Sequence, residues 1–145
     1  MLIGIPPLLG PELLATLRAM GHGDEIALVD ANYPAQEHAR RLVRADGHGL
    51  IPVLDAILQV TPVDDFVPQA LFRATVGGDP DLLDPVHEEM IAACARRAPG
   101  HKVFPLVGDA FYSRVRAAHT VVATSEPRLY GNLIIRKGVV HPSET

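Results

Sequence analysis

A histidine between two glycines, Gly21-His22-Gly23, is the residue of this chain best suited to acid–base chemistry. Glycine allows a close backbone approach or a positive φ and leaves a neighbouring imidazole accessible. Histidine has an unperturbed pKa of about 6.5, so the ring can take up or release a proton at neutral pH. Core packing does not account for a histidine in this setting. A helix C-cap that includes an exposed histidine is the structural alternative.

A carboxylate follows a short distance along the chain. Residues 25–30 read Glu-Ile-Ala-Leu-Val-Asp, a mostly apolar run that predicts a buried strand with Asp30 at its carboxyl end. Ligands of α/β domains bind at that edge of the sheet. Asp30 is therefore a candidate binding residue.

Other polar segments have simpler explanations. Val43-Arg44-Ala45-Asp46-Gly47 is expected to be a polar turn with a structural Arg44–Asp46 pair. Asp64-Asp65 is expected to be a pair of solvated turn charges, and Tyr130-Gly131-Asn132, taken alone, is a turn that leads into the last strand.

Several common sites are excluded by spacing. The segment Gly21-His22-Gly23-Asp24 is similar to the start of a dinucleotide fingerprint, but it follows a helix instead of a strand, and the position of the third glycine is occupied by Ile26. The chain has no P-loop and no Gly-x-Ser-x-Gly nucleophile motif. Its seven histidines are scattered, so no metal site is predicted. Cys94, within an apolar helix, is expected to be a packed thiol rather than a nucleophile.

The elements that must position these residues indicate one α/β domain over residues 1–145. Helices are predicted at about 11–20, 51–60, 84–98 and 110–117, and strands at about 25–30, 70–76, 102–107, 120–124 and 133–136. Their near alternation predicts a three-layer α/β/α fold with a largely parallel central sheet.

The composition of the chain indicates which binding partners and which cellular location to expect. The chain has 145 residues and a formal net charge of −4, which argues against nucleic-acid binding. It has no apolar run of membrane-spanning length and no positively charged signal-peptide region near Met1. A single cysteine allows no internal disulfide, so a cytoplasmic location is expected.

Three segments together resemble the ribose pyranase/fucose mutarotase family, and its fucose mutarotase branch more closely. They are Met20–Ile26 with Asp30–Ala35 (Met-Gly-His-Gly-Asp-Glu-Ile and Asp-Ala-Asn-Tyr-Pro-Ala), Arg44–Gly47, and Tyr130–Asn132. The resemblance runs nearly end to end. It implies an enzyme that interconverts the anomers of a free monosaccharide without a cofactor. It also implies a cytoplasmic, ring-shaped homo-oligomer, such as a decamer, with sites near subunit boundaries.

The resemblance also assigns roles to individual residues. His22 matches the family's proton donor and Asp30 its sugar-binding carboxylate, while Tyr130, Gly131 and Asn132 match the tripeptide that lines the sugar pocket. The chain departs from the family at Gly108, where relatives have a sugar-binding arginine or histidine. This departure bears on which sugar is bound. It also leaves a non-catalytic sugar-binding protein as the alternative function.

Overall fold

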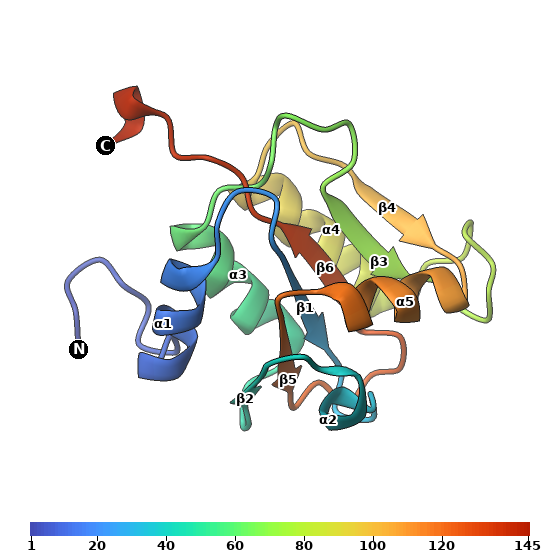
Figure 1. Ribbon diagram of the computed structural model, residues 1–145. Coiled ribbons are helices and arrows are strands. Elements are labelled where there is room, and N and C mark those ends of the chain that lie inside the picture. The colour runs from blue at the N-terminus through green and yellow to red at the C-terminus, as the bar shows by residue number, and fades with distance from the viewer.

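A six-stranded sheet forms the centre of the molecule in a computed structural model that describes residues 1–145 (Figure 1). The strands are β1 (Glu25–Val29), β2 (Leu42–Ala45), β3 (Leu71–Ala74), β4 (Val103–Leu106), β5 (Thr120–Thr124) and β6 (Leu133–Arg136). Their order across the sheet is β2-β5-β1-β6-β3-β4. Only β6 runs antiparallel to its neighbours, β1 and β3. The predicted largely parallel sheet is confirmed.

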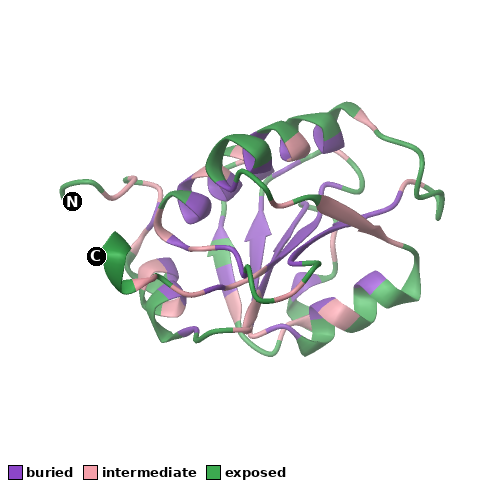
Figure 2. Cartoon of the chain, turned by 90° about the horizontal axis from the view of Figure 1, so that it is seen from above, coloured by how far each residue is buried: buried purple, intermediate pink, exposed green.

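Helices cover both faces of the sheet, which confirms the three-layer arrangement (Figure 2). They are α1 (Pro11–Ala19), α2 (Ala35–His38), α3 (Leu50–Val60), α4 (Pro85–Arg97) and α5 (Asp109–Ala117), with a short 3-10 helix, η1 (Pro142–Glu144), near the C-terminus. The apolar sides of α1, α3 and α4 build the larger core on one face, and α2 and α5 build the smaller core on the other. Buried residues accordingly colour the sheet and the inner sides of the helices, whereas the outer sides are exposed (Figure 2).

Two short elements differ from the prediction. β2 occupies residues 42–45, where a turn was expected from residue 43, and α2 is a single helical turn after Pro34. β2 is an edge strand whose Arg44 faces solvent between the buried Val43 and Ala45. Four residues with one charge carry too little periodicity to be recognised, and pairing with β5 decides their conformation. The Arg44–Asp46 pair is present and bidentate, at 2.9 and 3.0 Å.

The direction of the strands determines where a site can form. The carboxyl ends of β1 to β5 lie along one edge of the sheet, which runs from the bottom to the right of Figure 1, and β6 begins there because it runs the other way. This edge is where ligands of α/β domains bind. None of the helices has the length and apolar character that crossing a membrane would require.

Candidate functional site

Asp30 and Asn132 lie together at the carboxyl edge of the sheet. Asp30 directly follows β1 and Asn132 directly precedes β6. The backbone N–H of Asp30 donates to Asn132 Oδ1 at 2.8 Å, and Asp30 Oδ1 accepts the backbone N–H of Asn32 at 2.9 Å. Burial raises the pKa of Asp30, although hydrogen bonds from Asn32 and Asn132 oppose it. Antiparallel β6 thus brings together two candidates that are 102 positions apart.

Tyr130 and Gly131 are held in unusual geometry beside this pair. Tyr130 has a φ of 61° and is the only non-glycine residue with a positive φ. Gly131 has little room for a side chain, because a Cβ there would lie 3.0 Å from Glu126 Cγ and 3.2 Å from the Arg128 carbonyl oxygen. Glu126 is itself fixed, since its buried carboxylate accepts the Leu50 N–H at 3.1 Å and the Arg128 Nε–H at 2.7 Å. The tripeptide is therefore built into the fold rather than being a free turn.

An open cavity of about 120 Å³ lies against Tyr130 and Asn132. Its lining is formed by Ala74, Thr75, Gly78, Leu106, Gly108, Phe111, Tyr112, Tyr130 and Asn132. None of these side chains is charged, which suits a neutral ligand with hydroxyl groups. Asp30 is not part of this lining; it lines a separate hollow with Tyr33 and Arg44, and its backbone bond to Asn132 connects it to the cavity.

Gly108 is part of this lining and leaves open space there. It directly precedes α5 with a φ of 51°, and a Cβ at this position would meet nothing within 4 Å. The side chain of the next residue, Asp109, does not fill this space, because Asp109 is not among the lining residues.

His22 lies at the opposite edge of the sheet. It sits in the turn before β1, whereas Asp30 follows the same strand. β1 has five residues, which at about 3.3 Å each span roughly 16 Å. A single copy of the chain therefore does not place His22 beside Asp30, Tyr130 and Asn132 on one monosaccharide.

His22 is paired with a buried carboxylate that the sequence did not reveal. Its Nε2 lies 3.0 Å from Asp64 Oδ1. Asp64 is fully buried and also accepts the Phe66 N–H at 3.0 Å and the Arg136 Nε–H at 2.7 Å. The expectation that Asp64 is a solvated turn charge is therefore wrong, while the adjacent Asp65 is exposed as expected. No local signal distinguishes these two aspartates, because the partners of Asp64 come from distant segments.

The bonds to Asp64 determine which nitrogen of His22 is free. Burial acts to raise the pKa of Asp64, but hydrogen bonds from Phe66, Arg136 and His22 outweigh it and lower the pKa. An ionised carboxylate only accepts hydrogen bonds, so His22 carries a proton on Nε2. Nδ1 then faces outward on a side chain that is 44% exposed.

Phe66 covers part of the imidazole of His22. The two ring centroids are 4.9 Å apart, and Phe66 is 65% exposed. The ring of His22 is thus less open than its flanking glycines suggested.

Close contacts hold the turn that carries His22 and the segment that carries Asp64. Gly23 has a φ of 86°, and a Cβ there would lie 3.0 Å from Arg136 Nη2. Lys137 Nζ donates to the carbonyls of Leu17 and Met20 at the end of α1. Gly138 packs so closely that a Cβ would lie 2.6 Å from the carbonyl oxygen of Val63, the residue before Asp64. The glycine and lysine after β6 therefore support both His22 and Asp64.

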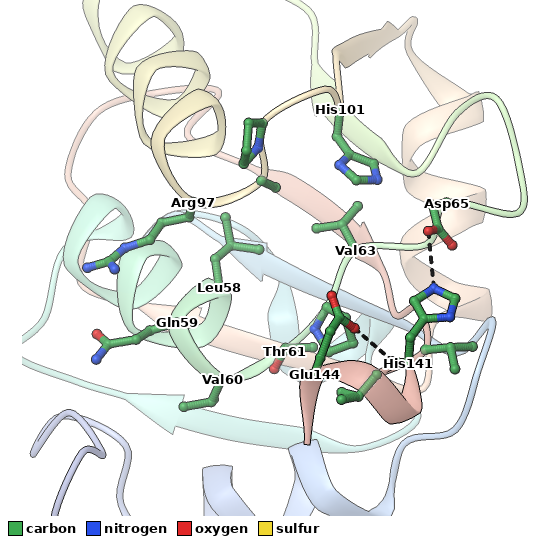
Figure 3. A pocket seen from close by; sticks show the side chains of 15 residues that line it. Leu58, Gln59, Val60, Thr61, Val63, Asp65, Arg97, His101, His141 and Glu144 are labelled. Carbon is green, nitrogen blue, oxygen red and sulfur yellow. Dashed lines mark hydrogen bonds and ion pairs between the residues drawn. The ribbon is translucent and has the colours of Figure 1, made fainter.

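A larger hollow, of about 410 Å³, lies between the ends of α3 and α4 and the C-terminal segment (Figure 3). His141 donates through its backbone N–H to Glu144 and lies 3.4 Å from Asp65, as the dashed lines show (Figure 3). The hollow contains none of the predicted site residues. No group of three or more potential metal ligands occurs here or elsewhere in the structure.

Comparisons with known proteins identify the family of this chain. The model of the RbsD / FucU transport protein family matches residues 3–140. The chain belongs to this family. It is 43% identical to an L-fucose mutarotase of Actinobacillus pleuropneumoniae serotype 5b, over 96% of this chain and 97% of the relative. It is 41% identical to the fucose mutarotase of Homo sapiens, over 94% and 93% of the two chains.

A solved structure is similar along its whole length. The fucose mutarotase of Streptococcus pneumoniae in complex with L-fucose superposes with a TM-score of 0.88 at 37% identity, and the match covers 97% of this chain and 100% of the other. The α/β architecture with a mostly parallel sheet is thus that of the family.

Proposed function

We propose that this protein is a mutarotase that interconverts the α and β anomers of a free, fucose-like monosaccharide. The observation that carries the proposal is the uncharged cavity lined by Tyr130 and Asn132, with Asp30 bonded to Asn132, in a chain 43% identical to an L-fucose mutarotase. A carboxylate can accept two sugar hydroxyls, an amide can both donate and accept, and a phenol can bridge to a hydroxyl. Asp30, Asn132 and Tyr130 would together orient the sugar ring.

The reaction needs only the movement of protons. In its imidazolium form, with Nε2–H still bonded to Asp64, His22 gives its Nδ1 proton to the ring oxygen. The anomeric hydroxyl releases its proton to water, and the bond between C1 and the ring oxygen breaks. The open-chain aldehyde turns about the C1–C2 bond and closes with the opposite configuration, which returns the proton. A positioned acid–base group contributes about 10²–10⁴-fold. No cofactor is consumed in these reaction steps.

We infer that each site is completed by a second copy of the chain. His22 and Asp30 lie about 16 Å apart along β1, so the imidazole that serves one sugar must come from a neighbour. Exposed apolar side chains at both edges suit such a contact: Phe66 beside His22, and Leu129 and Val107 near the cavity. A closed homo-oligomer, a decamer or similar ring in the cytoplasm, satisfies this requirement.

Complementation tests the shared site. His22→Ala and Asn132→Ala are each expected to reduce the exchange of L-fucose anomers, measured by NMR saturation transfer, to near the buffer rate. Subunits of the two variants, unfolded together and refolded as mixed oligomers, should regain part of the activity, because some sites then combine an intact His22 with an intact Asn132. Arg97→Ala, a change at a surface pair with Asp55 outside the cavity, serves as the control and should leave exchange unchanged.

The outcomes separate the parts of the proposal. No recovery in mixed oligomers, or a mass near 15.6 kDa by light scattering, contradicts the shared site. Full exchange by His22→Ala contradicts the role of His22 as proton donor.

The same assay decides the alternative function, a non-catalytic sugar-binding protein. Gly108 favours this alternative because it provides no group that could bind the sugar. Saturable binding of L-fucose without any acceleration of exchange would establish it, whereas accelerated exchange by the wild type would exclude it.

A further inference from the structure

His87 is a buried histidine that the proposed reaction does not use. It lies in the first turn of α4 and is fully buried. Both of its ring nitrogens are engaged: Nδ1 accepts the backbone N–H of Asp84 at 3.1 Å, and Nε2 lies 2.9 Å from the carbonyl oxygen of Tyr130. The ring therefore joins the start of α4 to the tripeptide beside the cavity.

The two bonds determine the state of the ring. A backbone N–H only donates, so Nδ1 of His87 must present its lone pair, and in a neutral ring Nε2 carries the proton that is donated to Tyr130. Burial lowers the pKa of His87, and the buried Arg73 guanidinium lowers it further, although the bond to Tyr130 acts in the opposite direction. The charged groups that face His87 are Arg73 from β3 and Asp84 at the start of α4, and the neutral form satisfies both hydrogen bonds.

Tyr130 is a residue whose backbone needs such support. A tyrosine at a φ of 61° is strained, and such strain persists only when the surroundings impose it. The Tyr130 carbonyl accepts the His87 ring proton and also the backbone N–H of Asn132 at 2.8 Å. Val86, next to His87, packs close to Gly131, where a Cβ would lie 3.5 Å from Val86 Cγ2. The first turn of α4 therefore holds the backbone of the tripeptide through His87 and Val86.

We propose that His87 is a positioning residue for the sugar site, which fixes the Tyr130 carbonyl and thereby the direction in which the Tyr130 phenol meets the sugar. This inference rests on the proposed function. It assigns His87 no contact with the sugar and no part in proton transfer.

A pair of variants separates the two bonds of His87. The amide of His87→Gln reaches the place of Nε2 and can still donate to Tyr130, whereas the shorter His87→Asn reaches only the place of Nδ1 and keeps the bond from Asp84. His87→Asn should raise the KM for L-fucose about three- to tenfold, with a smaller change in kcat, because it weakens one hydrogen bond from the Tyr130 phenol to the sugar. His87→Gln should stay near the wild-type KM. Equal effects of the two variants, or none, would overturn the proposal.

A double-mutant cycle tests whether the effect passes through the phenol. In a Tyr130→Phe background, His87→Asn should change the KM by less than about twofold, since coupled sites are not additive. A full effect in that background would overturn the proposal. An unchanged KM in Tyr130→Phe alone would refute the sugar-binding role of Tyr130, and this inference with it. A raised KM in Tyr130→Phe with none in His87→Asn would refute this inference alone.

A measurement on the unmodified protein keeps the test independent of folding defects. Solid-state ¹⁵N NMR of the histidine-labelled protein at neutral pH identifies His87 as the signal that is present in the wild type and missing from folded His87→Gln, and this signal should be that of a neutral ring protonated on Nε2. A charged ring, or one protonated on Nδ1, would contradict the donated bond to Tyr130.

Discussion

Replacing Asp64 with asparagine should affect both stability and exchange, because this carboxylate is buried between His22 and the Arg136 guanidinium. The isosteric amide keeps one acceptor oxygen for the Phe66 N–H but puts an NH₂ donor against the Arg136 Nε–H. The loss of one hydrogen bond to a charged group costs about 1.5–3 kcal/mol of unfolding free energy. Arg136 keeps a second carboxylate, Glu25, at 3.8 Å, so it is not left without a counter-charge.

The effect of Asp64→Asn on exchange follows from the tautomer of His22. An amide can accept from Nε2–H or, after a flip, donate to a bare Nε2, so it no longer selects one tautomer. We expect anomer exchange to fall about ten- to a hundredfold, which is part of the roughly 10²–10⁴-fold that a positioned acid–base group supplies. The assay is NMR saturation transfer on L-fucose well below the unfolding midpoint, with urea denaturation at a fixed protein concentration for stability.

Asp65→Asn is the matched control for this experiment. Asp65 is adjacent and exposed, and its side chain has one polar partner, His141 at 3.4 Å. It should leave stability and exchange near the wild-type values. A folded Asp64→Asn variant that exchanges L-fucose at the wild-type rate would refute the conclusion that Asp64 orients His22.

Three further predictions follow from the same geometry. Gly108→Arg should raise the exchange of L-fucose and lower that of the sugar preferred by the wild type. Because a side chain at a φ of 51° is strained, a urea titration must first show that the variant is folded. Unchanged rates for both sugars in the folded variant would show that residue 108 does not face the sugar. Gly138→Ala should lower the unfolding free energy by about 1–3 kcal/mol through overpacking, because its Cβ would lie 2.6 Å from a backbone oxygen. Gly10→Ala has open space around it and loses only the preference for glycine at the N-cap of α1, so it should cost at most about 1 kcal/mol in the same urea titration. Asp64 and Glu126 have lowered pKa values in the folded state, so the stability they contribute is fully present above their unfolded pKa of about 4 and is lost as pH falls through the folded values. Between pH 6 and 3, urea titrations should therefore show a smaller loss of unfolding free energy for Asp64→Asn than for the wild type. Equal losses would contradict the lowered pKa of Asp64.

The amino-acid sequence by itself determined the layers of the fold and most of its elements. Apolar runs such as 120–124 and 133–136 are long enough to identify buried strands, and both have the predicted bounds in the structure. Pro85, after Asp84, correctly predicted the start of α4, because a proline is tolerated in the first turn of a helix. These features depend on neighbours in the chain, and the sequence contains that information directly.

The conformations of β2 and α2 depended instead on tertiary pairing. The four residues of β2 become a strand because β5 provides hydrogen-bonding partners, while their own pattern also fits a turn. Elements this short have no strong preference of their own, so contacts distant in sequence decide them.

For the candidate site too, the sequence identified some features and the tertiary structure decided others. Motif and resemblance pointed to His22, Asp30 and Asn132 from the sequence, and the bond between Asp30 and Asn132 followed once β6 paired with β1. Sequence alone did not show that His22 lies at the other end of the same strand.

Asp64 and His87 were accessible only through the tertiary structure. Asp64 has the same type and local setting as the exposed Asp65, and His87 lies on a helix with no metal-binding spacing. What distinguishes them is burial against partners 42, 72 and 43 positions away, namely His22 and Arg136 for Asp64 and Tyr130 for His87. Burial makes an unpaired polar group costly, so these contacts give both side chains their significance, and such contacts exist only after the chain has folded.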